Sequence, residues 1–132
     1  MSDARRAPRG PSTALVRVGP AVLYVAAVFV MGSVPLSGPP APAGSDKVAH
    51  LVIFGAMVPI LLRAVHYVRA DESVRASLTI AMVGSSAIGA LLEIWQSFIP
   101  YRSMEFLDWV ADTVGAVAAT ALMLAVLARR RA

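Results

Sequence analysis

Side chains that could do chemistry gather in three separated stretches of this sequence. They are charged, imidazole or amide groups, and they comprise Asp46, Lys47, His50, Glu93, Gln96, Arg102, Glu105, Asp108 and Asp112. Residues three or four positions apart share one side of an α-helix, as Asp46 and His50 or Asp108 and Asp112 would. The spacing therefore predicts that each stretch presents its polar groups on one helical face.

Acid–base catalysis is one chemistry that these residue types allow. His50 could act as a general base, with Asp46 or Asp108 orienting the imidazole and Arg102 stabilising developing negative charge. His50 and Asp108 are thus the candidate catalytic residues. Covalent catalysis is disfavoured, because the chain has no cysteine and no serine nucleophile is evident beside the histidine.

Ligand binding is a second chemistry, and it would use the same polar groups without a reaction. Lys47 and Arg102 could meet a phosphate or carboxylate, while the acids orient these cations or meet an amine. The predicted ligand-binding residues are Asp46, Lys47, His50, Glu93, Gln96, Arg102, Asp108 and Asp112.

A metal site is an alternative that fewer residues support. Its candidate ligands are Asp46, His50, Asp108 and Asp112, whose carboxylate oxygens suit magnesium or manganese. Thiolate ligands are excluded, because the chain has no cysteine. We therefore expect no resident cofactor, with a divalent cation as the one exception that the residue types allow.

Four long apolar runs carry these stretches, at about residues 18–36, 47–68, 76–98 and 105–128. A membrane-spanning helix needs about 20 mostly apolar residues, and every run is near that length. The chain is 58% hydrophobic and only 15% charged, and a soluble domain this short could not hide so much apolar surface. We therefore predict an all-α integral membrane protein. Its single domain, residues 18–128, would be a four-helix transmembrane bundle.

The positive charges predict the orientation of this bundle. Among the lysines and arginines, only Lys47 and Arg102 fall on the side of the membrane opposite the termini. Short cytoplasmic segments carry an excess of Lys and Arg, so both termini, the basic segments 1–17 and 129–132, are predicted to be cytoplasmic, in the cell (inner) membrane. The net charge of +4 is then a topology signal, and no nucleic-acid partner is expected. The polar stretches would face the outside.

The first apolar run could instead be a signal peptide. Residues 41–43, Ala-Pro-Ala, resemble a small-residue cleavage sequence. However, the basic segment before the run is long, and the run exceeds the usual core of a signal peptide. We therefore expect the first helix to be retained.

Glu93 raises the main electrostatic question among the acids. It lies near the end of its predicted helix, where the helix dipole disfavours negative charge, and ionisable groups in a membrane are costly unless they are paired. We expect Arg102 or Lys47 to compensate it. Acids that open a helix, such as Asp46 and Asp108, have a simpler alternative role, because carboxylates are favoured in a first helical turn.

The order of these motifs resembles the VanZ-like family of small membrane proteins. The first family motif is matched by Asp46-Lys47-x-x-His50, and the second by Glu93-x-x-Gln96, Pro100, Arg102, Asp108 and Asp112-x-x-Gly115. The resemblance covers about residues 15–128 of the chain. Two positions depart from the family pattern: Asp112 stands where the family generally has asparagine, and Leu51 stands where an aromatic residue is common.

The resemblance implies a bacterial membrane protein of the cell envelope with a role in resistance to the glycopeptide antibiotic teicoplanin. The partners expected are membrane lipids, and a lipid-linked cell-wall precursor or a lipophilic glycopeptide. Three interpretations stay open: a protein that binds or modulates such a ligand, an enzyme acting on a lipid-linked substrate, and a polar clamp that only holds helices together. Transport is disfavoured, because Arg63 and His66 are the only comparable polar residues in the inner half of the spans.

Overall fold

The computed structural model describes residues 11–35 and 42–130, and the regular secondary structure of the described chain is all α-helix, without strands. The four helices are α1 (Pro11–Ser33), α2 (Ser45–Val68), α3 (Val74–Gln96) and α4 (Phe106–Arg129). The predicted all-α fold is confirmed. Several residues of the topology argument lie outside the described residues, namely Arg5, Arg6, Arg9, Ala41 and Arg131.

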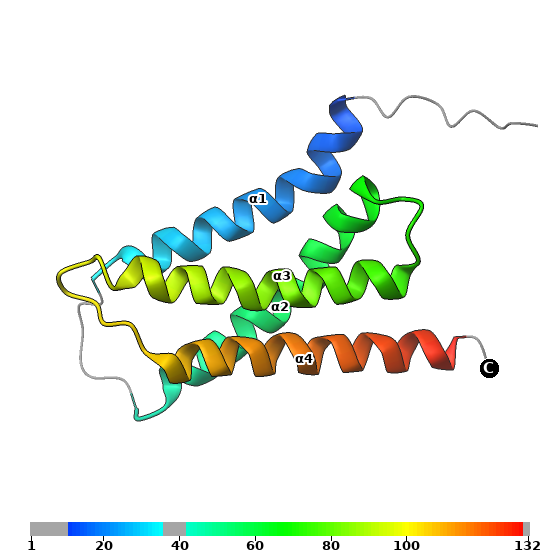
Figure 1. Ribbon diagram of the computed structural model, residues 1–132. Helices are drawn as coiled ribbons and strands as arrows, with labels where there is room; N and C mark the ends of the chain where they lie inside the picture. Colours follow the sequence, from blue (N-terminus) through cyan, green and yellow to red (C-terminus); the bar gives the residue numbers. More distant parts are fainter. Residues whose placement is uncertain (1–10, 36–41, 131–132) are drawn as a thin grey trace, which may run out of the picture.

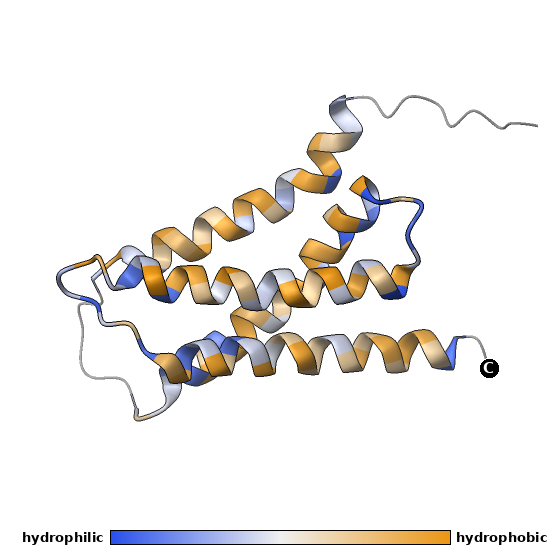
Figure 2. Cartoon of the chain, in the orientation of Figure 1, coloured by the Kyte–Doolittle hydropathy of each residue, from blue (hydrophilic) through white to orange (hydrophobic). Residues whose placement is uncertain are grey.

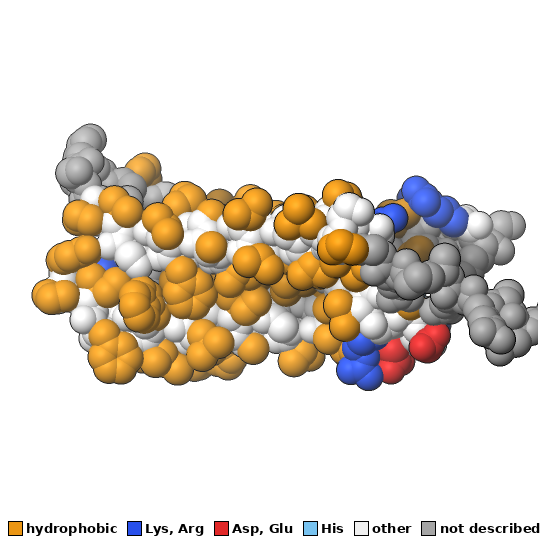
Figure 3. Space-filling view, turned by 90° about the horizontal axis from the view of Figure 1, so that it is seen from above, with side chains coloured by type: hydrophobic (Ala, Val, Ile, Leu, Met, Phe, Trp, Pro, Cys, Tyr) orange, Lys and Arg blue, Asp and Glu red, His pale blue; other side chains and the backbone are white. Residues whose placement is uncertain are grey.

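All four helices are long and apolar enough to cross a membrane. Each has 23 or 24 residues, and their mean hydropathies lie between 1.6 and 2.1. At 1.5 Å per residue such helices are about 35 Å long, slightly more than a hydrocarbon core of about 30 Å. Hydrophobic side chains cover the middle of the face in Figure 3, where lipid would lie, whereas most charged groups gather toward one end. The chain is a multi-pass membrane protein.

All four helices start within seven residues of the predicted positions, and two of the differences have a clear local reason. α1 begins at Pro11 instead of residue 18, because proline is well suited to the first position of a helix. Pro20 therefore lies inside α1, and this helix bends along its length in Figure 1. α3 begins at Val74, because the Ser73 hydroxyl accepts a hydrogen bond from the Ala76 N–H at 3.1 Å and caps the helix.

The helices run alternately up and down; in Figure 1, α3 lies between α1 and α4, and α2 crosses behind it. α2 and α3 each pack against the other three helices, whereas α1 contacts α2 and α3 but not α4 in the described part of the chain. One apolar core cluster joins α1, α2 and α3 around Phe54, Met57 and Leu92. A second joins α2, α3 and α4 around Val58 and Leu78.

Glycine allows α2 and α4 to touch backbone to backbone. A Cβ atom at Gly115 on α4 would collide with the carbonyl oxygen of Leu51 on α2. A Cβ at Gly55 on α2 would in turn lie only 3.1 Å from the carbonyl oxygen of Gly115. Small residues are the usual means of close helix approach in membranes. This contact lies one turn from Asp112 and fixes how deeply α4 can settle against α2.

Hydrophilic residues gather near the helix ends on both sides of the bundle (Figure 2), and the two ends differ in the charges that they carry. At the site end, α1 and α3 end and α2 and α4 begin. At the basic end, α1 and α3 begin and α2 and α4 end. The basic end carries the described arginines Arg17, Arg63, Arg69, Arg75, Arg129 and Arg130.

Candidate functional site

The structure brings the polar stretches of the sequence together at the site end. The first turns of α2, the last turn of α3, the α3–α4 loop and the first turns of α4 all contribute. The contributing residues are Asp46, Lys47, His50, Glu93, Gln96, Arg102, Glu105, Asp108 and Asp112. Segments more than forty residues apart in sequence therefore form one polar cluster.

His50 lies between the two aspartates of α4. Its Nδ1 atom is 2.8 Å from Oδ1 of Asp112, and its Nε2 atom is 3.7 Å from Oδ2 of Asp108. The imidazole also stacks on Phe54, with the two rings inclined by 8°. Because Asp108 and Asp112 are one helical turn apart, the face that they share meets the histidine. Asp112, rather than Asp46, is thus the nearest acid to His50.

Lys47 forms ion pairs with three carboxylates at the edge of the cluster. Its Nζ atom is 3.0 Å from Asp46, 3.2 Å from Glu105 and 2.9 Å from Asp108. The predicted role of Asp46 as the orienting partner of His50 is therefore not observed, because Asp46 is exposed and faces Lys47. Nor does Glu105, the residue before α4, cap that helix through its side chain.

Glu93 is compensated by a helix terminus and not by a cation. Its Oε2 atom accepts a hydrogen bond from the backbone N–H of Glu105 at 2.8 Å. Neither Arg102 nor Lys47 forms an ion pair with it in the described part of the chain, so the expected pairing is wrong. The first N–H groups of a helix have no partner within that helix and carry the positive end of its dipole. The start of α4 therefore supplies what a cation was expected to supply.

A cavity of about 280 Å³ opens between α1, α2 and α3 beside this cluster. Most of its wall is apolar, with Val28, Ile53 and Leu92 among the lining residues. Polar groups gather at one part of the wall, where His50, Asp46, Gln96 and Arg102 reach the same cavity. A ligand with both apolar and charged parts would match this division.

The side chains of Arg102 and Gln96 differ in whether a hydrogen bond to the described protein already occupies them. The Nε2 atom of Gln96 donates to the carbonyl oxygen of Gly32 at 3.2 Å, which ties α3 to α1. Arg102 is one of the residues that line the cavity, and its guanidinium makes no hydrogen bond or ion pair with any described residue. Only the backbone N–H of Arg102 is used, by the carbonyl oxygen of Ile99 at 3.0 Å. Arg102 is consequently available to an anionic ligand.

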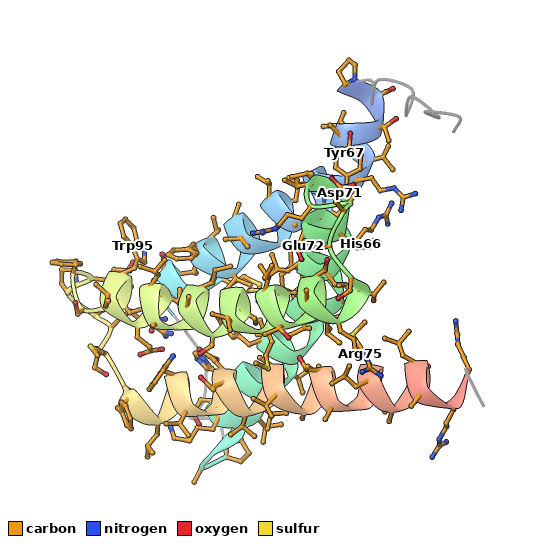
Figure 4. All side chains as sticks on the ribbon, turned by 45° about the vertical axis from the view of Figure 1, so that its right-hand side comes forward. His66, Tyr67, Asp71, Glu72, Arg75 and Trp95 are labelled. Atoms are coloured by element: carbon orange, nitrogen blue, oxygen red, sulfur yellow. The ribbon has the colours of Figure 1, made fainter. Side chains whose placement is uncertain are left out.

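Sequence reasoning missed the part of the cavity that α1 provides and the hydrogen bonds that hold α1 against the other helices. The Tyr24 hydroxyl donates to the carbonyl oxygen of Ile53 at 2.8 Å and anchors α1 to α2. Trp95, labelled on α3 in Figure 4, donates to the Ser33 hydroxyl at 2.9 Å. Tyr101 donates to the Ser33 carbonyl oxygen at 2.7 Å. The single signal in the sequence was the presence of hydrogen-bonding groups in or beside apolar runs, and that signal does not name a partner.

The candidate metal ligands separate into two groups. His50, Glu93 and Asp112 can each offer one ligand atom within 4.8 Å of the others, and so can Asp46, Glu105 and Asp108. The predicted set of Asp46, His50, Asp108 and Asp112 is thus divided between them, and Glu93 replaces two aspartates beside the histidine. The first group is largely buried and the second is mostly exposed.

Comparison with known proteins shows to which family this chain belongs. The model of the VanZ/LLP1 family matches residues 18–128, which is most of the chain. This match confirms the resemblance drawn from the motifs. Neither the search of curated proteins nor that of solved structures found a match.

Proposed function

The chain belongs to the VanZ/LLP1 family, and from this membership we propose that it is a cell-envelope protein that binds an amphiphilic ligand with an anionic group. The ligand would be a membrane lipid, a lipid-linked cell-wall precursor or a lipophilic glycopeptide. These share an apolar tail next to a phosphate or carboxylate. The observation that carries the proposal is the cavity between α1, α2 and α3, whose mostly apolar wall includes Arg102, an arginine whose side chain has no partner among the described residues.

The cavity supports this choice by its shape and lining. Binding sites for small molecules are commonly concave and mostly apolar, with a few polar groups that orient the ligand. Here the apolar wall comes from three helices, while His50, Gln96 and Arg102 provide the polar groups. An acyl or isoprenoid chain would occupy the apolar part, because van der Waals packing against the apolar wall can replace its contacts with neighbouring lipid tails.

Arg102 gives the site its preference for anions. A guanidinium binds phosphate or carboxylate through paired hydrogen bonds, and such charge-assisted bonds are the stronger ones. Lys47 cannot take this part as readily, because three carboxylates already surround it. Asp46 at the cavity wall would meet an amine on the same head group. Holding a glycopeptide or its lipid-linked target in this way would account for a resistance-type role.

We further propose that the site end faces the outside of the cytoplasmic membrane and that both termini are cytoplasmic. The excess of arginine at the basic end supports this orientation, since positive residues are enriched on the cytoplasmic side. Reporter fusions within residues 69–75 and after the last residue should score as cytoplasmic. A fusion within residues 101–104 should score as external, and a cytoplasmic result there would reverse the orientation.

The binding test compares two arginines at opposite ends of the bundle. Purified chain in detergent would be titrated with phosphatidylglycerol, a lipid-linked diphosphate and teicoplanin, and bound ligand would be counted by native mass spectrometry. Arg102→Gln should weaken binding by about tenfold or more, because a hydrogen bond to a charged group contributes about 1.5–3 kcal/mol. Arg75→Gln, which alters an exposed arginine at the basic end, is the matched control.

Three outcomes separate the interpretations. Preference for one of the three probes identifies the source of the ligand. Equal binding by Arg102→Gln and wild type would contradict the proposal. If ligand binding falls only in proportion to a loss of thermal stability, the cluster acts as a structural clamp and not as a binding site.

A second candidate function, hydrolysis of a lipid-linked substrate, is favoured by the contact between His50 and Asp112. A carboxylate that accepts the Nδ1 proton of a histidine leaves the Nε2 atom free to act as a base. Water would be the nucleophile in such a reaction. Release of phosphate from a lipid-linked diphosphate by wild type but not by His50→Gln would favour this function, and the absence of turnover by wild type would reject it.

A further inference from the structure

Two buried carboxylates at the site end lack partners that such groups require. Glu93 is 1% exposed and Asp112 is 0% exposed. One oxygen of each, Oε1 of Glu93 and Oδ2 of Asp112, is shielded from solvent and has no hydrogen-bond partner in the described part of the chain. Buried polar atoms are nearly always paired, and buried charges are paired or bind a metal. These two oxygens therefore need a further partner.

The nearby cations do not provide a partner for these two oxygens. Lys47 lies 2.9 to 3.2 Å from three other carboxylates, and Arg102 makes no ion pair with either acid. His50 contacts Asp112 through Nδ1 at 2.8 Å, and a histidine carries at most one positive charge. The start of α4 compensates Glu93 through one oxygen, but a helix N-terminus supplies only about half an elementary charge. The pair Glu93 and Asp112 would therefore keep part of its negative charge in an interior of low dielectric.

We propose that His50, Glu93 and Asp112 bind a divalent transition metal ion such as Mn²⁺ or Zn²⁺. A ring nitrogen of His50 and one oxygen from each carboxylate lie within 4.8 Å of one another. Ligand atoms about 2.1 Å from a metal are about 3.0–3.4 Å apart in octahedral or tetrahedral geometry. The three side chains would close on a bound ion to reach this spacing. One imidazole with two carboxylates suits both ions.

The surroundings hold the three ligands in place. Each comes from a different helix, and the remaining oxygen of Glu93 is already fixed by the Glu105 N–H at 2.8 Å. Asp108 lies 3.7 Å from Nε2 of His50, on the side away from Nδ1. A histidine that binds a metal through one nitrogen commonly donates the other N–H to a carboxylate. Asp108 is placed to accept that proton.

Gly89 provides the space that Asp112 occupies. A Cβ atom at Gly89 on α3 would collide with the Asp112 carboxylate. The glycine therefore lets this carboxylate lie directly against α3, next to Glu93 one turn further along the same helix. The absence of one side chain thus brings two acids together at a depth where neither meets water.

The test measures metal content, which is independent of ligand binding by Arg102. The full chain, purified in detergent and stripped with chelator, would be titrated with Mn²⁺, Zn²⁺ or Co²⁺. Bound metal would be counted by mass spectrometry, and Co²⁺ absorption would report the ligand geometry. Wild type should bind about one ion per chain, and Glu93→Gln and Asp112→Asn should each weaken binding at least tenfold.

The second acidic group provides matched controls. Asp46→Asn and Glu105→Gln each remove a carboxylate from the same end of the bundle but outside the proposed site, and both should keep the affinity of wild type. Wild type that retains no ion above the buffer level would overturn the proposal, and so would equal losses in Glu105→Gln and Glu93→Gln. If the site variants fail to accumulate, wild type alone decides. Its melting temperature should fall with chelator and recover with added metal, and an unchanged melting temperature would reject the site.

Discussion

The substitution Gly115→Ala tests how packing between helices controls the site. The added Cβ would collide with the carbonyl oxygen of Leu51, so α4 must move away from α2. An ordinary contact for a Cβ atom begins at 3.4 Å. Because the obstacle is backbone and not the end of a flexible side chain, the helices must separate by about an ångström to reach it. Asp112, one turn away on α4, would move with them and lose its 2.8 Å contact with His50.

Three contributions set the expected size of this effect. Overpacking costs about 1–3 kcal/mol, and loss of a hydrogen bond to a charged group costs about 1.5–3 kcal/mol. Replacing glycine by alanine in a helix offsets about 1 kcal/mol of this. We therefore expect Gly115→Ala to lower the free energy of unfolding by about 1.5–5 kcal/mol.

The assay is reversible unfolding in mixed detergent micelles, with Gly84→Ala as the matched control. A Cβ at Gly84 on α3 would meet only the Cδ1 atom of Leu61, at an ordinary 3.7 Å, so this variant should be as stable as wild type or more stable. The two glycine substitutions should thus have opposite signs. If Gly115→Ala unfolds with the wild-type midpoint, the close approach of α2 and α4 does not hold the site together.

Other changes test single contacts of the cluster by the same unfolding measurement. Lys47→Gln and Asp108→Asn should each destabilise the chain. The stability lost by the double variant should be smaller than the sum of the two single losses by at least about 0.5 kcal/mol, because the two side chains lie 2.9 Å apart. Additive losses would show that this ion pair contributes nothing. Glu93→Gln and Arg102→Gln should be additive to within about 0.5 kcal/mol, because these residues do not pair, and strong coupling would restore the pairing expected from sequence. Tyr24→Phe should cost about 1 kcal/mol, since it removes the 2.8 Å hydrogen bond between α1 and α2, and an unchanged midpoint would mean that this bond does not anchor α1.

The sequence alone determined the class of the protein and the location of its polar groups along the chain. Long apolar runs need no partner to be recognised, because a helix in lipid satisfies its own backbone hydrogen bonds. The periodicity of the helix likewise placed Asp108 and Asp112 on one face before any packing was known. The motif order pointed to the family that the comparison then confirmed.

Only the tertiary structure decided which polar groups meet. Helical spacing says which residues share a face but not which helix lies opposite, so the sequence suggested Asp46 or Asp108 as the partner of His50 and not Asp112, which is the nearest acid in the structure. Which acid meets His50 depends on two glycines that allow the helices to pack closely. Gly115 allows α4 to touch α2, and Gly89 leaves room for the Asp112 carboxylate beside α3.

The compensation of Glu93 shows the same division most clearly. The sequence indicated correctly that a carboxylate at the end of α3 needs a positive partner, because this follows from the direction of the helix dipole alone. It could not indicate that the partner is a backbone N–H at the start of α4. Every residue except proline has such a group, so no residue type marks it in the sequence. Its role appears only when the loop returns the chain to bring the start of one helix against the end of another.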